Sequence, residues 1–272
     1  AIHSNQIIAK IMVEAAAGAL PAFPAYAIQV VPTTDRGAIP ELLSLTRFVD
    51  LCIPRGGESL IRAVTECSHV PVIKQYKGVC DVYIDADADA TMAEEIVFNS
   101  KVHRPGVCNA AETLLVDKSV ATDVLPRLAK RLANANVELR GDKPTQALLD
   151  GSGVEITPAS AADWDEEYLD LVLSVKIVDG VGEAIEHINT HGSGHTETIV
   201  TGDSAAAKRF QTEVDSSTIF WNASTRFTDG GQFGMGAEIG ISTDKIGARG
   251  PMGLEELTSY KWLGVADGLI RP

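Results

Sequence analysis

The stretch N-S-K-V-H-R-P-G-V-C-N-A-A-E-T-L-L-V occupies residues 99–116 and contains one cysteine, Cys108. A polar turn with glycine and proline precedes this cysteine, and the apolar run 113–116 follows it. A short apolar run bounded by a turn is typical of a buried strand. The pattern therefore predicts that Cys108 lies in a loop that leads directly into such a strand.

Three basic residues, Lys101, His103 and Arg104, precede Cys108 with no acidic residue between them and the cysteine. Positive charges of this kind lower the pKa of a thiol and increase the fraction of nucleophilic thiolate. The pattern favours a reactive cysteine, although a lone cysteine in an apolar setting is more often a small buried hydrophobic residue. Both interpretations stay open at this point.

The composition limits the classes of partner. The 272 residues carry a net charge of −14, which repels nucleic acid and anionic membranes, so that we expect neither as a partner. The same charge repels small anions, and an anionic substrate therefore needs a local basic pocket. No apolar run approaches the ~18–20 residues of a membrane helix. The four cysteines show no C-x-x-C or dense disulfide spacing, and we expect a cytoplasmic location.

Short apolar runs alternate with helical patterns along the chain, and this alternation predicts an α/β fold with a parallel, doubly wound sheet. Helices are expected at residues 6–17, 40–45, 59–67, 91–101, 120–135, 182–189 and 205–213. Strands are expected at 26–31, 48–53, 70–74, 113–116, 137–140, 169–178, 198–201 and 217–221. Residues 141–164 have the composition of a loop.

Alternating aspartates at 85–89 resemble the ligands of a calcium loop. Such a loop needs a glycine where Ala90 stands and an acid where Ile96 stands, so the sequence excludes it. Thr91 and Glu94 instead predict a capping box at the start of the next helix.

His187, His191 and His195 recur at every fourth residue, as they do on a metal-binding helix face. Gly192 and Gly194 interrupt the segment, so that one helical face is not expected. We therefore predict no metal site and assign these histidines a structural or pocket-lining role.

A second polar block, Asn222, Ser224, Thr225, Arg226 and Phe227, follows an expected strand. Loops in this position often carry function, and the glycine-rich segment that comes next permits close approach of backbone to a ligand. Arg226 is suited to pair with a carboxylate or a phosphate of a substrate. An ordinary surface ion pair is an equal alternative.

The segment R-P-G-V-C-N-A-A-E-T-L-L-V (104–116) resembles the nucleophile segment of the aldehyde dehydrogenase superfamily, in the form found in the γ-glutamyl phosphate reductase (glutamate-5-semialdehyde dehydrogenase) family. Five further stretches resemble the same family: V-D-L-C-I-P-R-G-G (49–57), H-I-N-T-H-G-S-G-H-T (187–196), W-N-A-S-T-R-F-T-D-G (221–230), G-A-E-I-G-I-S-T-D-K (236–245) and A-R-G-P-M-G-L-E-E-L-T (248–258). The first residues, A-I-H-S-N-Q, match a position well inside the family's cofactor domain, so the resemblance implies that the family's N-terminal portion lies outside this sequence.

The resemblance implies an aldehyde-dehydrogenase-like fold, with a parallel Rossmann-type cofactor lobe that is incomplete here, an α/β catalytic lobe and a C-terminal oligomerisation strand. Residues 1–84 would form the remainder of the NADP-binding domain, and residues 85–247 the catalytic domain. Residues 248–272, including strand-like runs at 258–269, would form a return segment that pairs with a neighbouring subunit in a homo-oligomer, a dimer or higher.

The resemblance also implies a reaction in proline biosynthesis, in which L-glutamyl 5-phosphate is reduced to glutamate 5-semialdehyde. Cys108 would be the nucleophile that expels phosphate and forms a thioester, which NADPH then reduces. The oxyanion would be bound by the backbone N–H of Cys108 and by a side-chain amide, with Asn109 as a local candidate. Residues 222–227 would bind the substrate.

Cofactor residues follow from the same resemblance. Pro54, Arg55, Gly56 and Gly57 would line the NADP(H) cleft, where a strand-to-helix turn favours phosphate, although two adjacent glycines are equally typical of a plain tight turn. Glu167 would accept hydrogen bonds from the nicotinamide ribose; a solvated acid is the commoner fate of such a residue.

Residues 72–78, V-I-K-Q-Y-K-G, correspond to the segment in which hydrolytic aldehyde dehydrogenases carry a water-activating glutamate. No carboxylate occurs in this segment, and its absence favours reduction of an acyl phosphate over hydrolysis of a thioester. The alternatives to a γ-glutamyl phosphate reductase are another acylating semialdehyde dehydrogenase or a folded fragment without catalysis.

Overall fold

The structure, a computed structural model, describes residues 2–271 and divides into two compact units. The first unit comprises the chain up to Pro54 together with Arg62–Val72, and the second comprises Arg55–Ile61 and the chain from Ile73 onward. Each unit is described by itself.

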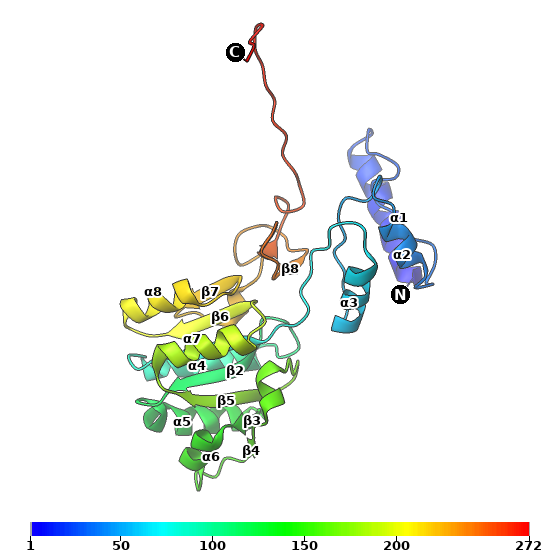
Figure 1. Cartoon of the computed structure of the whole chain (residues 1–272). Helices are drawn as coiled ribbons and strands as arrows, with labels where there is room; N and C mark the ends of the chain where they lie inside the picture. The colour runs from blue at the N-terminus through cyan, green and yellow to red at the C-terminus, as the bar shows by residue number, and fades with distance from the viewer. Residues whose placement is uncertain (1, 272) are drawn as a thin grey trace. The chain divides into compact units, whose positions relative to one another are not determined.

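The second unit is built on a seven-stranded sheet in the order β4-β3-β5-β2-β1-β6-β7 (Figure 1). Every pair of neighbouring strands is parallel. The strands are β1 (Cys80–Ile84), β2 (Ala111–Asp117), β3 (Glu138–Gly141), β4 (Ile156–Pro158), β5 (Val172–Val178), β6 (Thr196–Val200) and β7 (Thr218–Trp221). The predicted parallel α/β architecture is therefore confirmed.

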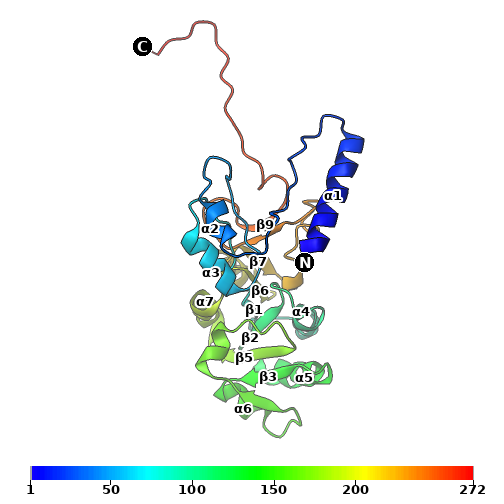
Figure 2. The same ribbon diagram turned by 90° about the vertical axis from the view of Figure 1, so that its right-hand side faces the viewer.

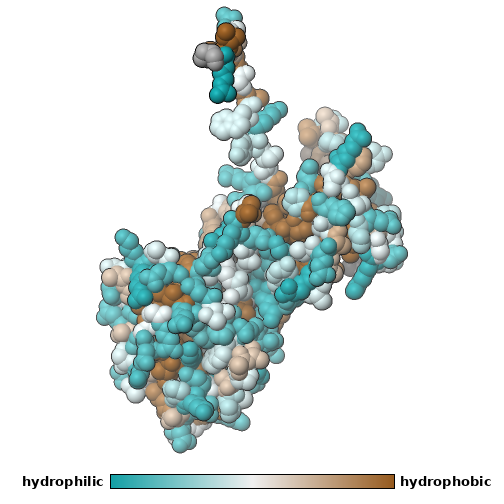
Figure 3. Space-filling view, in the orientation of Figure 1, coloured by the Kyte–Doolittle hydropathy of each residue, from teal (hydrophilic) through white to brown (hydrophobic). Residues whose placement is uncertain are grey.

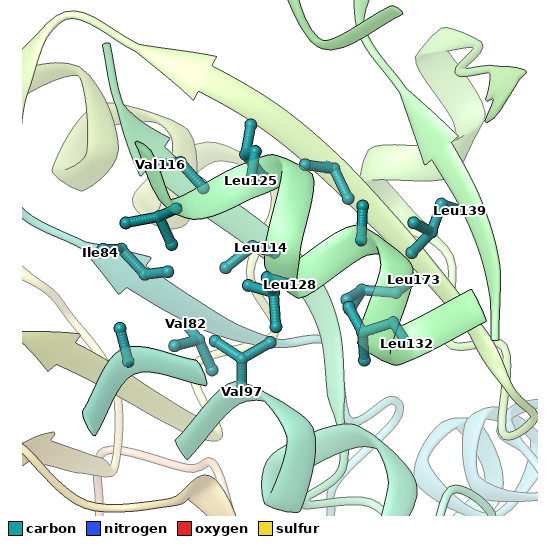
Figure 4. Close-up of a cluster of buried hydrophobic side chains, with 14 of the residues drawn as sticks. Val82, Ile84, Val97, Leu114, Val116, Leu125, Leu128, Leu132, Leu139 and Leu173 are labelled. Carbon is teal, nitrogen blue, oxygen red and sulfur yellow. The ribbon is translucent and has the colours of Figure 1, made fainter. Parts of the chain in front are cut away.

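Helices cover both faces of this sheet, as the two views in Figures 1 and 2 show. They are α4 (Ala90–Val102), α5 (Ala121–Asn134), α6 (Lys143–Leu149), α7 (Gly180–His191) and α8 (Ser204–Glu213). Successive side chains of a strand point to opposite faces. Val82 and Leu114 accordingly join the cluster under α4 and α5 in Figure 4, whereas Tyr83 and Leu115 join the cluster under α7 and α8.

Two expectations for this unit are wrong. Strand β1 was not predicted, although all five of its residues are buried and it lies between β2 and β6. Residues 141–164, predicted as a loop, contain α6, β4 and the 3₁₀ helix η1 (Ala161–Asp165). The side chain of Asp142 caps α6 by accepting from the N–H of Thr145 at 2.9 Å. Asp and Pro occur at helix starts and also in turns, and for this reason the composition of the segment predicted a loop.

The first unit contains α1 (Ile2–Ala19), α2 (Ala38–Leu43) and the C-terminal part of α3 (Glu58–Cys67). The predicted strands at 26–31, 48–53 and 70–74 do not form, and a single bridge between Cys52 and Val72 takes their place. An isolated strand pair is marginally stable at best. Helix α1 buries none of its residues, so its predicted apolar face stays exposed.

Strand β1 pairs with β2 and β6, and the division into compact units falls before it, near Ile73. The predicted domains at residues 1–84, 85–247 and 248–272 stay predictions. The NADP-binding role of residues 1–84 stays a prediction.

The chain ends in a small antiparallel pair, β8 (Gly240–Ser242) and β9 (Gly250–Met252), and an extended tail. Between residues 258 and 271 no helix or strand forms, and side chains such as Trp262 and Val265 are at least 90% exposed. Figure 3 shows hydrophobic side chains along this tail in brown. A strand needs a neighbour to satisfy its backbone. The predicted strand at 258–269 is thus absent from the chain by itself, and its pairing with another subunit stays a prediction.

Within residues 2–271, none of the helices combines the length and apolar character needed to cross a bilayer.

The N-cap of α4 corrects a further expectation. Asp89 has an extended backbone and its carboxylate accepts from the N–H of Met92 at 2.7 Å, whereas Thr91, the predicted cap, lies inside the helix. We expect Asp89→Ala to lower the free energy of unfolding by about 1 kcal/mol, because it leaves an N–H at the helix start without its acceptor.

The matched control is Thr91→Ala, measured by urea unfolding at the same pH. We expect little change for this variant. A loss for Thr91→Ala as large as that for Asp89→Ala would contradict the assignment of the cap.

Candidate active site around Cys108

Cys108 lies at the amino-terminal edge of the central strands, in the loop between α4 and β2. Because the strands are parallel, the segments that enter β1, β5 and β6 reach the same edge. These segments carry Gly78, Glu167 and His195. The predicted nucleophile and the predicted ribose-binding glutamate thus belong to one edge of the sheet.

Gly78 joins Cys108 to Glu167 through its backbone. A Cβ atom at Gly78 would lie 2.2 Å from the carbonyl oxygen of Cys108, a distance that no side chain tolerates. The N–H of Gly78 donates to Oε1 of Glu167 at 2.8 Å. Only glycine permits this approach, and the same peptide therefore positions the cysteine loop and the carboxylate together.

The electrostatic environment of Cys108 differs from the expectation. Burial raises the pKa of the Cys108 thiol, a hydrogen bond to Gln75 lowers it, and the charges of Glu238 and Glu167 raise it further. The expected lowering by the upstream basic residues is wrong for Lys101, because this ammonium group is buried and paired with a carboxylate. The described surroundings of Cys108 thus favour the protonated thiol over the thiolate.

The partner of Lys101 is Glu112, at 2.6 Å, and both side chains are almost completely buried. The two residues bracket the Cys108 loop, one in the last turn of α4 and the other in β2. The second oxygen of Glu112 accepts from the N–H of Leu169 at 3.3 Å, next to Glu167. Burial raises the pKa of Glu112 to about 7, and the charge of Lys101 opposes this shift.

Asn109, the predicted local oxyanion donor, is buried and its Nδ2 donates to the carbonyl of Thr228 at 2.8 Å. Its Oδ1 has no hydrogen-bond partner among the described residues. Thr228 in turn accepts from Thr196 Oγ1 at 2.8 Å through its own hydroxyl. One amide hydrogen of Asn109 is thus committed to the fold, and its role as an oxyanion donor stays a prediction.

The segment from Asn222 to Thr228 packs over α4, and most of its polar groups are engaged. Asn222 donates to the carbonyl and accepts from the N–H of Thr201, both at 2.9 Å. Ser224 lies 3.0 Å from Ser100, and Thr225 is fully buried. These contacts are structural, and the substrate role of the three residues stays a prediction.

Arg226 and Phe227, by contrast, line a hollow of about 280 Å³. Asn99 of α4 and His103 at the end of α4 line the same hollow, as do Asp229 and Gln232 in the loop after Phe227.

The predicted cofactor turn is split by the division of the chain, since Pro54 belongs to the first unit and Arg55, Gly56 and Gly57 to the second. The guanidinium of Arg55 lies over Gly240, where a Cβ atom would approach Nη1 to 2.7 Å. The role of this turn in binding NADP(H) stays a prediction.

The three spaced histidines do not share one helix face. Helix α7 ends at His191, and His195 lies in the turn before β6. His187 packs edge-on against Trp164, and His195 contacts the hydroxyl of Thr196 at 2.7 Å. Burial lowers the pKa of His187 to about 3 and that of His195 to about 4. In the described part of the chain, no group of three His, Cys, Asp or Glu side chains is arranged to hold a metal ion.

Sequence reasoning missed a buried carboxyl pair next to this site, Asp81 and Glu197. The N–H of Asp81 donates to Glu197 Oε2 at 2.7 Å, and Ser216 donates to Oε1 at 3.0 Å. Burial raises the pKa of both carboxyl groups. Oδ2 of Asp81 has no hydrogen-bond partner among the described residues. Two neighbouring buried carboxyl groups cannot both ionise, so we expect the pair to hold one proton, which can serve as a hydrogen-bond donor between the two groups.

Removing one partner of the Lys101–Glu112 pair tests its importance. We expect Lys101→Met to lower the free energy of unfolding by roughly 3–5 kcal/mol, because Glu112 must then either stay charged in the interior without its countercharge or take up a proton. The matched variant Lys101→Met/Glu112→Gln removes the charge as well and keeps an acceptor for Leu169. It should recover most of the loss in urea unfolding; equal losses in both variants would show that packing, not charge, dominates.

The Asp81–Glu197 pair predicts a pH dependence of stability. Because the folded-state pKa values are raised, the folded chain holds a proton that the unfolded chain releases above its ordinary carboxyl range. The free energy of unfolding should therefore fall as the pH rises from about 4 towards about 7. We expect Asp81→Asn to make this fall less steep.

Urea unfolding at a series of pH values measures the slope. The control is Glu95→Gln, since its hydrogen bond to Arg131 lowers the pKa of Glu95 and its titration lies below this range. An unchanged slope in Asp81→Asn would assign the effect to another buried carboxyl, such as Glu112.

Comparisons with known proteins agree with the resemblance carried by residues 104–116. The profile of the aldehyde dehydrogenase family matches residues 2–148. A γ-glutamyl phosphate reductase from Opitutus terrae is 53% identical over 270 residues, which cover 99% of this chain and 63% of the relative. One from Geobacter metallireducens is also 53% identical and covers 100% of this chain and 63% of the relative.

Solved structures agree with the fold. The crystal structure of γ-glutamyl phosphate reductase from Thermotoga maritima matches with a TM-score of 0.91 and 42% identity, over 97% of this chain and 63% of that one. An acetylating aldehyde dehydrogenase from Geobacillus thermoglucosidasius, at 22% identity and a TM-score of 0.69, covers 95% of this chain and 66% of that one and shows the fold alone. The chain thus spans 63% of the length of the curated relatives it matches.

Proposed function

The chain belongs to the aldehyde dehydrogenase family, and we propose that it carries the cysteine-dependent chemistry of a γ-glutamyl phosphate reductase. The observation that carries this proposal is the arrangement of Cys108, Gly78 and Glu167, which joins a cysteine loop to a carboxylate through one glycine peptide. The proposed reaction is the NADPH-dependent reduction of L-glutamyl 5-phosphate to L-glutamate 5-semialdehyde, a cytoplasmic step of proline biosynthesis.

In the first step, the sulfur of the Cys108 thiolate attacks the acyl carbon and the bond to phosphate oxygen breaks, which leaves a thioester on Cys108. The thiol must lose its proton first, and Gln75 stabilises the thiolate by a hydrogen bond while Glu167 and Glu238 oppose it. The backbone N–H of Cys108 is the nearest donor for the oxyanion in this proposal, with Asn109 beside it.

The residues at the site also fit a nicotinamide ribose. Glu167 uses Oε1 to accept from Gly78, which leaves Oε2 for a ribose hydroxyl. A nicotinamide cofactor held there would supply the hydride that reduces the thioester on Cys108, and the sulfur of Cys108 would then leave as the aldehyde is released. The turn Arg55-Gly56-Gly57 is the proposed contact for the cofactor's phosphates.

Reduction fits this site better than hydrolysis does. The segment 72–78 supplies Gln75 next to Cys108 and contains no carboxylate that would activate water. A thioester that is not hydrolysed survives until hydride arrives, and this is what reduction of an acyl phosphate needs.

The test is phosphate-dependent oxidation of glutamate 5-semialdehyde with NADP⁺. Because the chain spans 63% of its relatives, it is assayed both as it is and joined to the N-terminal portion of the Geobacter metallireducens relative. We expect turnover in at least the joined form, and a loss on the order of 10³-fold or more in Cys108→Ala, since the nucleophile is removed.

The same assay is repeated with short-chain aldehydes as substrates and with coenzyme A in place of phosphate. Turnover with coenzyme A alone would point to another acylating semialdehyde dehydrogenase. A folded protein without turnover in either form would mean that the chain does not catalyse this reaction.

A further inference from the structure

We propose that Arg226, together with His103 and Arg104, forms the subsite that binds the phosphate group of the acyl phosphate and holds it as it leaves. This inference deepens the proposed function and rests on it for the identity of the substrate. The anion site itself is testable without turnover or cofactor.

Arg226 is unusual among the basic side chains of residues 2–271. It is the one Lys or Arg that is withdrawn from solvent and yet forms no salt bridge to a carboxylate. Every other partly or fully buried Lys or Arg in this range has a carboxylate partner: Lys74, Lys77, Lys101, Arg131, Arg140 and Lys176. A desolvated cation without a countercharge costs free energy unless an anion binds beside it.

His103 and Arg104 lie near Arg226, the first as a hydrogen-bond partner and the second as a charge. Nε of Arg226 donates to Nδ1 of His103 at 3.4 Å, which orients the guanidinium along the wall of the hollow. Arg104 is close enough that its charge, second to burial, lowers the pKa of Arg226. The charges of the two guanidinium groups repel each other, and neither forms a salt bridge in the described residues, so a bound dianion would reduce this repulsion.

The site lies near the nucleophile, because Asn109, the neighbour of Cys108, donates to the carbonyl of Thr228, two residues after Arg226, at 2.8 Å. The negative charge of the Cys108 thiolate acts on Arg226 and raises its pKa, and Asp229 acts in the same direction from the wall of the hollow. A ligand bound at Arg226 therefore lies within electrostatic range of the sulfur. Asp229 limits the ligand to a position near Arg226 and His103, because its own carboxylate repels anions.

Of the two anionic groups of the substrate, the phosphate is the one expected at Arg226, because it lies nearer to the reacting carbon than the α-carboxylate does. The phosphate is bonded directly to the acyl carbon that Cys108 attacks, whereas the α-carboxylate is separated from this carbon by the rest of the glutamyl chain. When the thiolate forms the new S–C bond, the electron pair of the broken C–O bond stays on phosphate, which takes up one proton from water. A fixed guanidinium beside this oxygen stabilises the growing charge.

The test measures the rate at which iodoacetamide alkylates Cys108 in the chain as it exists, with and without inorganic phosphate at constant ionic strength. Peptide mass spectrometry isolates the Cys108 signal, because Cys52 and Cys67 are also partly exposed. We expect saturating phosphate to slow the reaction by about fivefold near neutral pH, because it screens Arg226 from the thiolate and covers the sulfur. Acetate at the same concentration should have little effect.

In Arg226→Gln, phosphate should no longer slow alkylation, and the rate without phosphate should be lower than in the native chain. In Arg226→Lys, part of the slowing by phosphate should remain. The control is Arg209→Gln, which removes an exposed guanidinium on α8 that pairs with Glu213. This variant should respond to phosphate as the native chain does.

Three results would overturn the subsite: no slowing by phosphate in the native chain, equal slowing by acetate, or an undiminished effect in Arg226→Gln. If Arg226→Gln does not fold, the native comparison of phosphate with acetate and the Arg226→Lys variant still decide the question. The outcome is separable from the proposed function. If phosphate slows alkylation through Arg226 but the chain shows no reductase turnover, the anion site is supported. The identification of its ligand as the acyl phosphate is then wrong.

Discussion

The buried ion pair between Lys101 and Glu112 is the contact on which the arrangement around Cys108 depends. It joins the end of α4 to the start of β2, and the cysteine loop spans the two residues. A buried pair of this kind tolerates little displacement, because either charge alone in the interior would be costly. The loop therefore begins and ends at fixed points, and Glu112 extends the constraint to Leu169 and hence to the segment of Glu167.

This constraint places the site at an uncommon edge of the sheet. Ligands of open α/β sheets usually bind outside the carboxyl ends of the strands, where helix N-termini point. Here the cysteine and Glu167 precede their strands and lie at the amino ends. The site therefore draws on single groups, namely the Gln75 amide, the Gly78 peptide and the guanidinium of Arg226.

Local patterns predicted most of the second unit from sequence, because its helices and strands bury regular apolar stripes. Strand β1 was not predicted because it is buried on both faces and so lacks an alternation of apolar and polar residues. In addition, Asp81 interrupts its short apolar run. The strands expected in the first unit are absent because their apolar residues lack neighbouring strands. For the site, motif resemblance identified Cys108, but spacing along the chain gave no information on which charges pair. Lys101 was therefore assigned to the thiol, although Glu112 neutralises it.

The charge of the whole chain explains why an unpaired arginine is informative. With a net charge of −14, the surface offers many carboxylates, and nearly every Lys or Arg that leaves solvent finds one. The same field opposes the approach of a substrate that carries phosphate. A site for such a substrate must therefore keep at least one cation free of internal partners, close to the reacting sulfur. Arg226 meets both conditions, since it forms no salt bridge in residues 2–271 and lies two residues from Thr228, which accepts a hydrogen bond from the neighbour of Cys108.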